Sequence, residues 1–206
     1  MYPSPSYPTD PELAERFAAE QRHGTLIATP PGGHPRVSIL PFVKTGDEIE
    51  LHCVQADPTF FALRANPRVT FLVSDFLAFT PHHFVNPRDA GRATLNFRAV
   101  AYECRAAWST DPADVAAALG RLLAAYEPDA SYEPVRDDAF YGSRLRRLAA
   151  LRLRVMDRQA KFKVAPAVPD EKKREIAGRL RARGLPGDER AAGVMESYLP
   201  GGGRRS

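Results

Sequence analysis

The sequence predicts an α+β fold, a small antiparallel six-stranded β-barrel with peripheral helices and a C-terminal helical extension. Two observations predict it. Six short segments are rich in apolar and β-branched residues, and turn-forming Gly, Pro, Asp and Asn separate most of them. Capped helices follow or interrupt these segments without the regular strand–helix alternation of a parallel sheet.

The first half of the chain is predicted to form one helix and three strands. A helix is expected from about residue 10 to 21, because Asp10 is a good N-cap and Pro11 a good first helical residue. The strands are expected over 24–29, 37–43 and 49–54. Pro41 indicates an edge or a bulge. Short connections predict that the three strands form a meander.

The second half is predicted to alternate between helices and strands. Strands are expected over 69–73, 93–104 and 149–158, with a polar loop at 80–92. Helices are expected from Asp57 to about Asn66, from Asp111 to Tyr126, over 171–183 and over 188–198. Asp170 is the expected cap of the helix over 171–183, and Gly184 is its expected end.

Length and composition limit the class of protein. The 206 residues fit one domain with a small appendage, and 44% hydrophobic and 26% charged residues are typical of a globular chain. No apolar run is long enough for a membrane helix, and the N-terminus lacks the features of a signal peptide, so a cytoplasmic protein is expected. Residues 1–9 are expected to be a flexible leader, 10–165 the barrel domain and 166–206 the helical extension and tail.

The sequence lacks the common motifs of several enzyme classes and of metal sites. The chain has no GxSxG, Walker, GxGxxG or HExxH motif, which argues against the commonest hydrolases, NTPases and dinucleotide-binding folds. Cys53 and Cys104 are expected to be buried free thiols. His82 and His83 are the only adjacent histidines, and on an extended loop they would point apart, so no metal site is expected.

The segment that follows the third strand could bind an anion. Gln55, Ala56, Asp57 and Thr59 open a short helix, whose first N–H groups attract negative charge, and the Thr59 hydroxyl could add a hydrogen bond. A cofactor phosphate could therefore bind here. The alternative is an ordinary capped helix, and the carboxylate of Asp57 would repel a phosphate.

The run ELHCVQADPTFFALRANPRVTFLVSD resembles the strand–turn–helix–strand of flavin-binding split barrels. More narrowly, the chain resembles the PaiB-type FMN-binding negative transcriptional regulators of the pyridoxamine-phosphate-oxidase-like superfamily. The family's H-V-A-R-A-N-P corresponds to HCVQADP at 52–58, and its S-P-x-W-Y to TPHHF at 80–84. Its P-T-W-N-Y corresponds to ATLNF at 93–97, and its K-x-K-L-S-Q-N begins as KFK at 161–163.

The resemblance implies a homodimer of split barrels with FMN at the subunit interface. The residues that would line the phosphate end are Gln55, Ala56, Asp57 and Thr59, and His52 is a further candidate cofactor-binding residue. The residues that would lie near the flavin ring or ribityl chain are Thr80, Pro81, His82, Thr94 and Asn96. Lys161 and Lys163 would supply positive charge.

Several family residues are replaced in this chain. Gln55 stands where the family has arginine, and Asp57 where it has asparagine, and each lost charge-assisted contact is worth about 1.5–3 kcal/mol. His83 and Leu95 replace two tryptophans, and each lost ring contact is worth about 0.5–1.5 kcal/mol. Residues 164–166 replace the S-Q-N of the last motif. FMN is therefore the implied cofactor, and haem or a deazaflavin are alternative planar ligands.

Two functions follow from the sequence. The first is a flavin-dependent oxidoreductase, in which the cofactor performs the redox chemistry and His52, His82 or His83 could donate protons. The second is a non-catalytic transcriptional regulator or binding protein. The net charge of +4 gives only weak support for nucleic acid as a partner. The basic stretch 171–183 could contact phosphates or form a solvated helix face, and no convincing helix-turn-helix pair is found.

Overall fold

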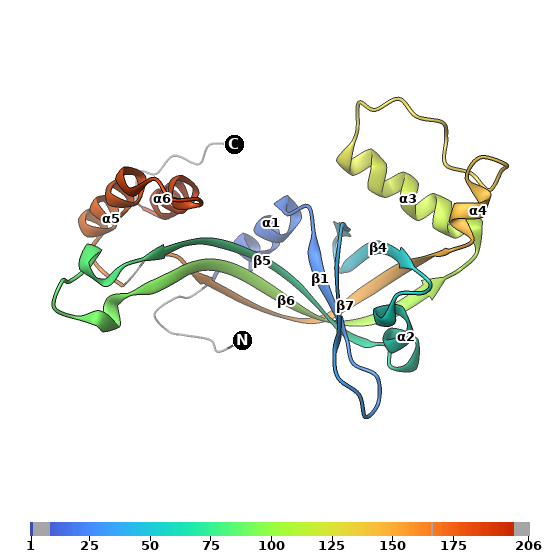
Figure 1. Cartoon of the computed structure of the whole chain (residues 1–206), viewed down its shortest axis with the longest axis horizontal. Coiled ribbons are helices and arrows are strands. Elements are labelled where there is room, and N and C mark those ends of the chain that lie inside the picture. Colours follow the sequence, from blue (N-terminus) through green and yellow to red (C-terminus); the bar gives the residue numbers. More distant parts are fainter. Residues whose placement is uncertain (2–8, 166, 200–206) are drawn as a thin grey trace. The chain divides into compact units, whose positions relative to one another are not determined.

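The structure is a computed structural model that describes residue 1, residues 9–165 and residues 167–199. Seven strands form an antiparallel sheet in the order β2-β1-β5-β6-β7-β4-β3 (Figure 1). The strands are β1 (Gly24–Ala28), β2 (Arg36–Leu40), β3 (Val43–Thr45), β4 (Glu48–Val54), β5 (Arg68–Thr80), β6 (Thr94–Ser109) and β7 (Leu148–Lys163). The predicted combination of antiparallel strands and helices is confirmed, but the predicted count of six strands is wrong.

Six α-helices are formed by the described residues. They are α1 (Pro11–Glu20), α2 (Pro58–Ala65), α3 (Pro112–Tyr126), α4 (Gly142–Leu145), α5 (Asp170–Arg183) and α6 (Asp188–Ser197). The side chains of Asp57 and Asp111 accept hydrogen bonds from the N–H groups two residues on, which confirms both predicted caps. The predicted cap Asp170 is instead the first residue of α5, which ends as predicted at Gly184 with φ of 69°. Throughout the described ranges, no helix has the length and apolar character needed to cross a membrane.

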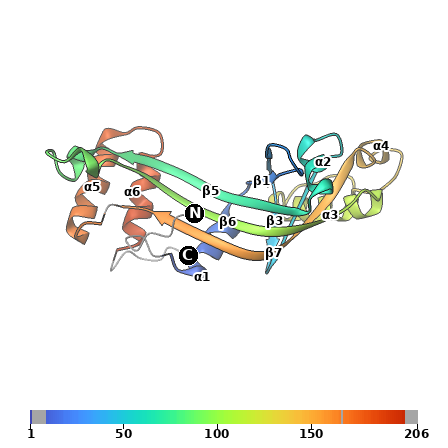
Figure 2. The ribbon, with the colours of Figure 1, turned by 90° about the horizontal axis from the view of Figure 1, so that it is seen from below.

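The chain forms two compact units. Unit 1 comprises residues 1–11, 74–99 and 160–206, and unit 2 comprises residues 12–73 and 100–159. The long strands β5, β6 and β7 contribute residues to both units and run side by side (Figure 2). The predicted division into leader, barrel domain and extension stays a prediction, and residues 2–8 and 200–206 lie outside the described residues.

The extra strand comes from a break at Pro41. The predicted strand 37–43 divides into β2, which pairs with β1, and β3, which pairs with β4. Both pairings of the predicted meander are therefore present, but two short strands replace its single middle strand. Because proline has no N–H to donate, the ladder cannot continue through it. The next residue, Phe42, bonds instead to the hydroxyl of Tyr126, which accepts from its N–H at 3.1 Å and donates to its carbonyl at 2.9 Å.

The strands β5, β6 and β7 are longer than predicted, because each continues through charged residues that interrupt the apolar pattern. Asp75 lies in β5 with only 5% of its surface exposed, where the sequence pattern alone would end a strand. Its Oδ2 accepts hydrogen bonds and ion pairs from Arg98 of β6 at 2.6 Å and Arg190 of α6 at 2.9 Å. A buried carboxylate is tolerated when cations satisfy it, and this pairing cannot be read from local periodicity.

Each unit has its own apolar core. In unit 1, α5 and α6 lie side by side (Figure 1) and bury Ile176, Leu180 and Met195 against Leu77 of β5. In unit 2, Phe71 is fully buried, and a Cβ added to Gly24 would lie 2.3 Å from its ring, so only glycine fits there.

The two cysteines are buried free thiols, as predicted. Burial raises the pKa of Cys53 to about 12, and the negative charge of Asp57 adds to this effect. Burial likewise raises the pKa of Cys104 to about 12. Since the thiolate is the reactive form, both groups are chemically inert near neutral pH.

Candidate functional site

A buried polar cluster in unit 1 joins the end of β5 to the start of β6. The side-chain Nδ2 of Asn96 donates to the carbonyl of Ala78 at 2.9 Å and to Oγ1 of Thr80 at 2.8 Å. Its Oδ1 accepts from the N–H of Ala165 at 3.0 Å. Asn96 and Thr80 are both completely buried. Asn96 therefore fixes the two strands and the segment after β7 in one arrangement.

Thr94 lies two residues before Asn96, and its hydroxyl is unusual. Only 8% of the residue is exposed, and Oγ1 has no hydrogen-bond partner within the described part of the chain. Buried hydroxyls are nearly always hydrogen-bonded, to protein or to water, because an unpaired one costs free energy. The Thr94 hydroxyl is therefore a group that a ligand or water could satisfy.

The connection between β5 and β6 is anchored on α5. It contains two short 3-10 turns, η1 (His82–Phe84) and η2 (Ala90–Arg92). Arg179 donates from Nη1 to the carbonyl of His83 at 3.1 Å, and its guanidinium lies 5.7 Å from the ring centre of Phe84. His82 is half-buried and His83 is exposed. Their rings stand at 86° to each other, and no cluster of three or more metal-binding side chains occurs in the part of the chain described.

Lys161 and Lys163 end β7 in the same unit. Both are half-buried and flank Phe162, whose N–H donates to Oγ1 of Thr9 at 3.1 Å. Two residues after Lys163, the N–H of Ala165 bonds to Asn96, which connects this end of β7 to the polar cluster. Unit 1 thus contains the seven predicted ring-end and lysine residues.

The four predicted phosphate-end residues and the candidate His52 lie in unit 2, where β4 leads into α2. Oδ1 of Asp57 accepts from the N–H of Thr59 at 2.7 Å, and Oδ2 accepts from Oγ of Ser38 at 2.9 Å. Nε2 of Gln55 donates to two backbone carbonyls, those of Arg146 at 3.0 Å and Leu148 at 2.8 Å. These polar groups therefore hold the chain together at this corner.

His52 and Ala56 complete the corner. His52 is half-buried in β4, and burial lowers its pKa, which favours the neutral imidazole. Ala56 is exposed and offers only backbone groups.

A comparison with protein-family models gives one match. The family described as "Putative FMN-binding domain" matches residues 1–157, which is most of the chain. The chain belongs to this FMN-binding family. None of the curated protein sequences that were compared with it is a match.

Solved structures similar to this FMN-binding-family chain share its fold. The flavocytochrome Anf3 from Azotobacter vinelandii has a TM-score of 0.59 and 20% identity, covering 79% of this chain and 72% of that one. A conserved hypothetical protein from Mycobacterium tuberculosis has a TM-score of 0.58 and 18% identity, covering 82% and 94%. An FAD and heme binding protein from Mycobacterium smegmatis has a TM-score of 0.56 and 17% identity, covering 87% and 80%. At these identities the likeness shows the split-barrel fold alone.

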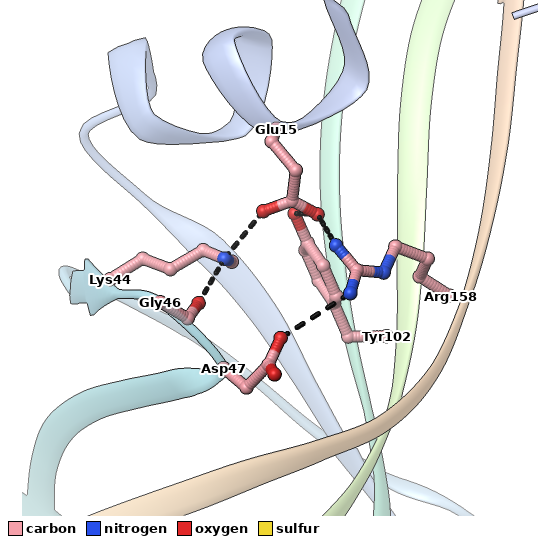
Figure 3. Close-up of polar contacts among 6 residues, drawn as sticks. All are labelled: Glu15, Lys44, Gly46, Asp47, Tyr102 and Arg158. Carbon is pink, nitrogen blue, oxygen red and sulfur yellow. Dashed lines mark hydrogen bonds and ion pairs between the residues drawn. The ribbon is translucent and has the colours of Figure 1, made fainter. Parts of the chain in front are cut away.

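Sequence reasoning missed a charged cluster in unit 2 (Figure 3). Glu15 of α1 accepts from Nζ of Lys44 at 2.5 Å and from Nη1 of Arg158 at 2.7 Å. The hydroxyl of Tyr102 donates to the same carboxylate at 3.3 Å, and Arg158 also bonds to Asp47 at 3.3 Å. Burial alone would raise the pKa of Glu15, but the hydrogen bonds and charges of Lys44 and Arg158 hold it below its ordinary value. No local sequence signal could reveal these contacts, because the residues come from separate elements.

Two hollows on unit 2, of about 320 and 350 Å³, are lined by none of the twelve predicted residues. The first holds the exposed indole of Trp108 and the Arg121–Glu50 ion pair, whose shorter N–O distance is 2.6 Å. The second is mainly apolar and lies between α3 and the segment that leads to α4. Both therefore lie apart from the residues that carry the family resemblance.

Proposed function

We propose that this protein binds a flavin through the polar cluster at the β5–β6 connection of unit 1. Membership of an FMN-binding family supports the ligand class. The observation that carries the proposal is the buried hydroxyl of Thr94, which lacks a partner among the described residues. A flavin ring system carries carbonyl and ring-nitrogen groups along one edge, and one of these could satisfy that hydroxyl.

The neighbouring side chains suit the same role. Thr80 is completely buried and its Oγ1 accepts from Asn96, so this contact holds the end of β5 in place at the connection. Half-buried His82 and the two lysines at the end of β7 add polar and positive groups in the same unit. When bound, a flavin supplies two-electron redox chemistry, while these residues orient it and shape its electrostatic environment.

An oxidoreductase role is favoured over a PaiB-type DNA-binding role by the charges on α5. Most basic side chains of this helix are already paired with carboxylates of unit 1. The pairs are Lys172 with Glu175, Lys173 with Asp170, Arg179 with Glu175, Arg181 with Glu189 and Glu196, and Arg183 with Asp188. Contact with a nucleic-acid backbone requires cations that can neutralise phosphates, and paired cations do this poorly.

The Thr94→Val variant tests the flavin proposal. Valine keeps the shape and removes the orphaned hydroxyl, so the ligand-free protein should gain about 1 kcal/mol of unfolding free energy. Flavin should bind about fivefold more weakly, since one hydrogen bond is worth about 1 kcal/mol. Flavin fluorescence titration and urea denaturation measure the two effects.

Thr70→Val is the matched control, because Thr70 is a half-buried threonine of β5 in unit 2. It should leave flavin affinity unchanged. Absence of a flavin signal in titrations with both riboflavin and FMN would contradict the proposal, and a Soret band on adding haemin instead would assign a haem ligand.

We also propose that the protein forms a homodimer. Three large apolar side chains of β5 and β6 in unit 1 are exposed, namely Phe76 at 71%, Phe79 at 52% and Leu95 at 41%. Large exposed apolar side chains are typical of an interaction surface when they form a contiguous patch, and a dimer contact would cover these three.

Sedimentation should therefore give twice the chain mass of 22.7 kDa, and the double variant Phe76→Glu with Phe79→Glu should give the single mass. Phe61→Glu in unit 2, which changes an equally exposed phenylalanine, is the control and should remain dimeric. A wild-type protein that sediments as a monomer would rule out the dimer.

A further inference from the structure

The mainly apolar hollow beside α3, with a volume of about 350 Å³, has the character of a small-molecule site. It is lined by Leu119 and Leu123 of α3, by Leu145 at the end of α4 and by Leu148 at the start of β7. Ligand sites in proteins are typically hollows of about 300–1,000 Å³ with apolar walls and a few polar groups. Every lining residue belongs to unit 2, so the hollow is complete within that unit.

The segment between α3 and α4 contributes Tyr132, Val135 and Tyr141 to the lining, and its own hydrogen bonds hold it in place. Oδ1 of Asp138 accepts from the N–H of Tyr141 at 2.9 Å. The hydroxyl of Tyr141 donates to the carbonyl of Glu133 at 3.1 Å. The hollow is therefore formed before any ligand enters, which lowers the entropy cost of binding.

Arg144 places a fixed positive charge on the lining of the hollow. Its Nη2 donates to the carbonyl of Phe140 at 3.3 Å, and its guanidinium lies 4.9 Å from the ring centre of Phe140 and 5.2 Å from that of Tyr141. It forms no ion pair with a carboxylate among the residues that the structure describes. Since the one hydrogen bond uses one of five N–H groups, the guanidinium can still bind a carboxylate through paired hydrogen bonds.

Glu127 is the other charged residue of the lining, and its side chain is not fixed in the same way. The residue is exposed, and its carboxylate has no hydrogen bond or ion pair with any described residue. To bind a cation it would have to lose rotamer freedom, whereas Arg144 is already held by its contacts. The arrangement therefore favours a ligand with a negative charge over one with a positive charge.

We propose that this hollow binds a small monocarboxylate with an apolar body, of the class of medium-chain fatty acids. Removal of the apolar body from water among the leucine side chains supplies most of the affinity. The contact between the ligand carboxylate and Arg144 supplies the preference for an acid. The proposal goes beyond the flavin site and does not depend on it, because no residue of unit 1 takes part.

Calorimetric titration of the full-length protein with octanoate, 1-octanol and octylamine tests the proposal, because the three probes share one chain and differ in charge. Octanoate should bind most tightly. In heteronuclear NMR spectra it should shift the amide signals of Val135, Tyr141 and Leu145. No binding of octanoate, shifts confined to other segments, or equal or tighter binding of 1-octanol or octylamine would each overturn the proposal.

The variant Arg144→Gln assigns the charge preference to this side chain. Octanoate affinity should fall about fivefold, the effect of about 1 kcal/mol expected for a charge contact at an exposed position. The affinity for 1-octanol should stay within about twofold of the wild-type value. Arg147→Gln is the matched control, because it removes the same charge from an exposed arginine that does not line the hollow. Equal octanoate affinities of the two variants would overturn the assignment.

Discussion

Replacing Gly187 by alanine is expected to destabilise the protein by about 2–4 kcal/mol, because the new Cβ would clash with backbone. An ideal Cβ at this position lies 2.1 Å from the carbonyl oxygen of Leu77 in β5, and a carbonyl in a strand cannot move aside. The φ of Gly187 is also +88°, which disfavours any side chain. The variant should show a lower midpoint of urea denaturation and loss of packing between α6 and β5.

Gly193→Ala provides a control within α6 itself. Nothing lies within 4 Å of a Cβ added there, so alanine should raise stability by about 0.5–1 kcal/mol through helix propensity. Equal denaturation midpoints for the two alanine variants would show that the close approach of Gly187 to Leu77 does not constrain the fold.

Glu15→Gln is the second substitution with a large expected effect, a loss of about 3 kcal/mol at neutral pH. The Lys44 side chain is only 6% exposed, and Glu15 is its ion-pair partner at 2.5 Å. Glutamine leaves the ammonium buried without a counter-charge, and breaking a buried pair from one side is costly. We place the effect at the lower end of the known range because 27% of the Glu15 side chain is exposed.

The effect of Glu15→Gln should depend on pH. The pKa of Glu15 is held below its ordinary value in the folded protein, so ionised Glu15 stabilises the fold at any pH above the carboxyl pKa of the unfolded chain. This contribution is lost as the pH falls through the lowered pKa. The wild-type and variant proteins should therefore converge in stability only in acid, below about pH 4.

Two further variants test the interpretation of the cluster. Glu20→Gln, at an exposed position of the same helix, should have little effect at any pH. Glu15→Leu combined with Lys44→Met should recover much of the lost stability, because apolar groups replace the whole pair. If the double variant is less stable than Glu15→Gln alone, the destabilisation by Glu15→Gln does not arise from the unpaired ammonium of Lys44.

Local signals in the sequence predicted the helices well. Asp57, Asp111 and Gly184 act through contacts within a few residues, so their positions fix where helices begin or end. The strand pairing was predicted less well. Pro41 was recognised as an interruption, but its consequence depends on the contact between Phe42 and Tyr126, which are 84 residues apart in sequence. Likewise, the charged residue Asp75 made β5 look shorter than it is, because its pairing with Arg98 and Arg190 cannot be read from the sequence.

In the candidate site, too, contacts between side chains from separate elements could not be predicted from the sequence. The family resemblance grouped Thr80, Thr94 and Asn96 near one ligand, and the structure places Thr80 at the end of β5 in hydrogen-bond contact with Asn96 of β6. It could not show that the Asn96 amide donates to the carbonyl of Ala78 and to Thr80, or that the Thr94 hydroxyl has no hydrogen-bond partner among the residues that the structure describes. The competing interpretations of residues 55–59 also stayed open at the sequence level, since only side-chain geometry shows which groups the Asp57 carboxylate accepts from.

The pairing of β4 with β7 has a consequence for how the chain reaches its native state. Glu48 lies opposite Arg154, so the partner of this strand is synthesised about a hundred residues later. Contacts of such long sequence separation carry a large loop-closure cost and slow folding. While the ribosome is still translating the middle of the protein, the edge of β4 that will pair with β7 has no hydrogen-bond partner. An unpaired strand edge favours aggregation and chaperone binding, so the nascent chain is most exposed to both during this interval.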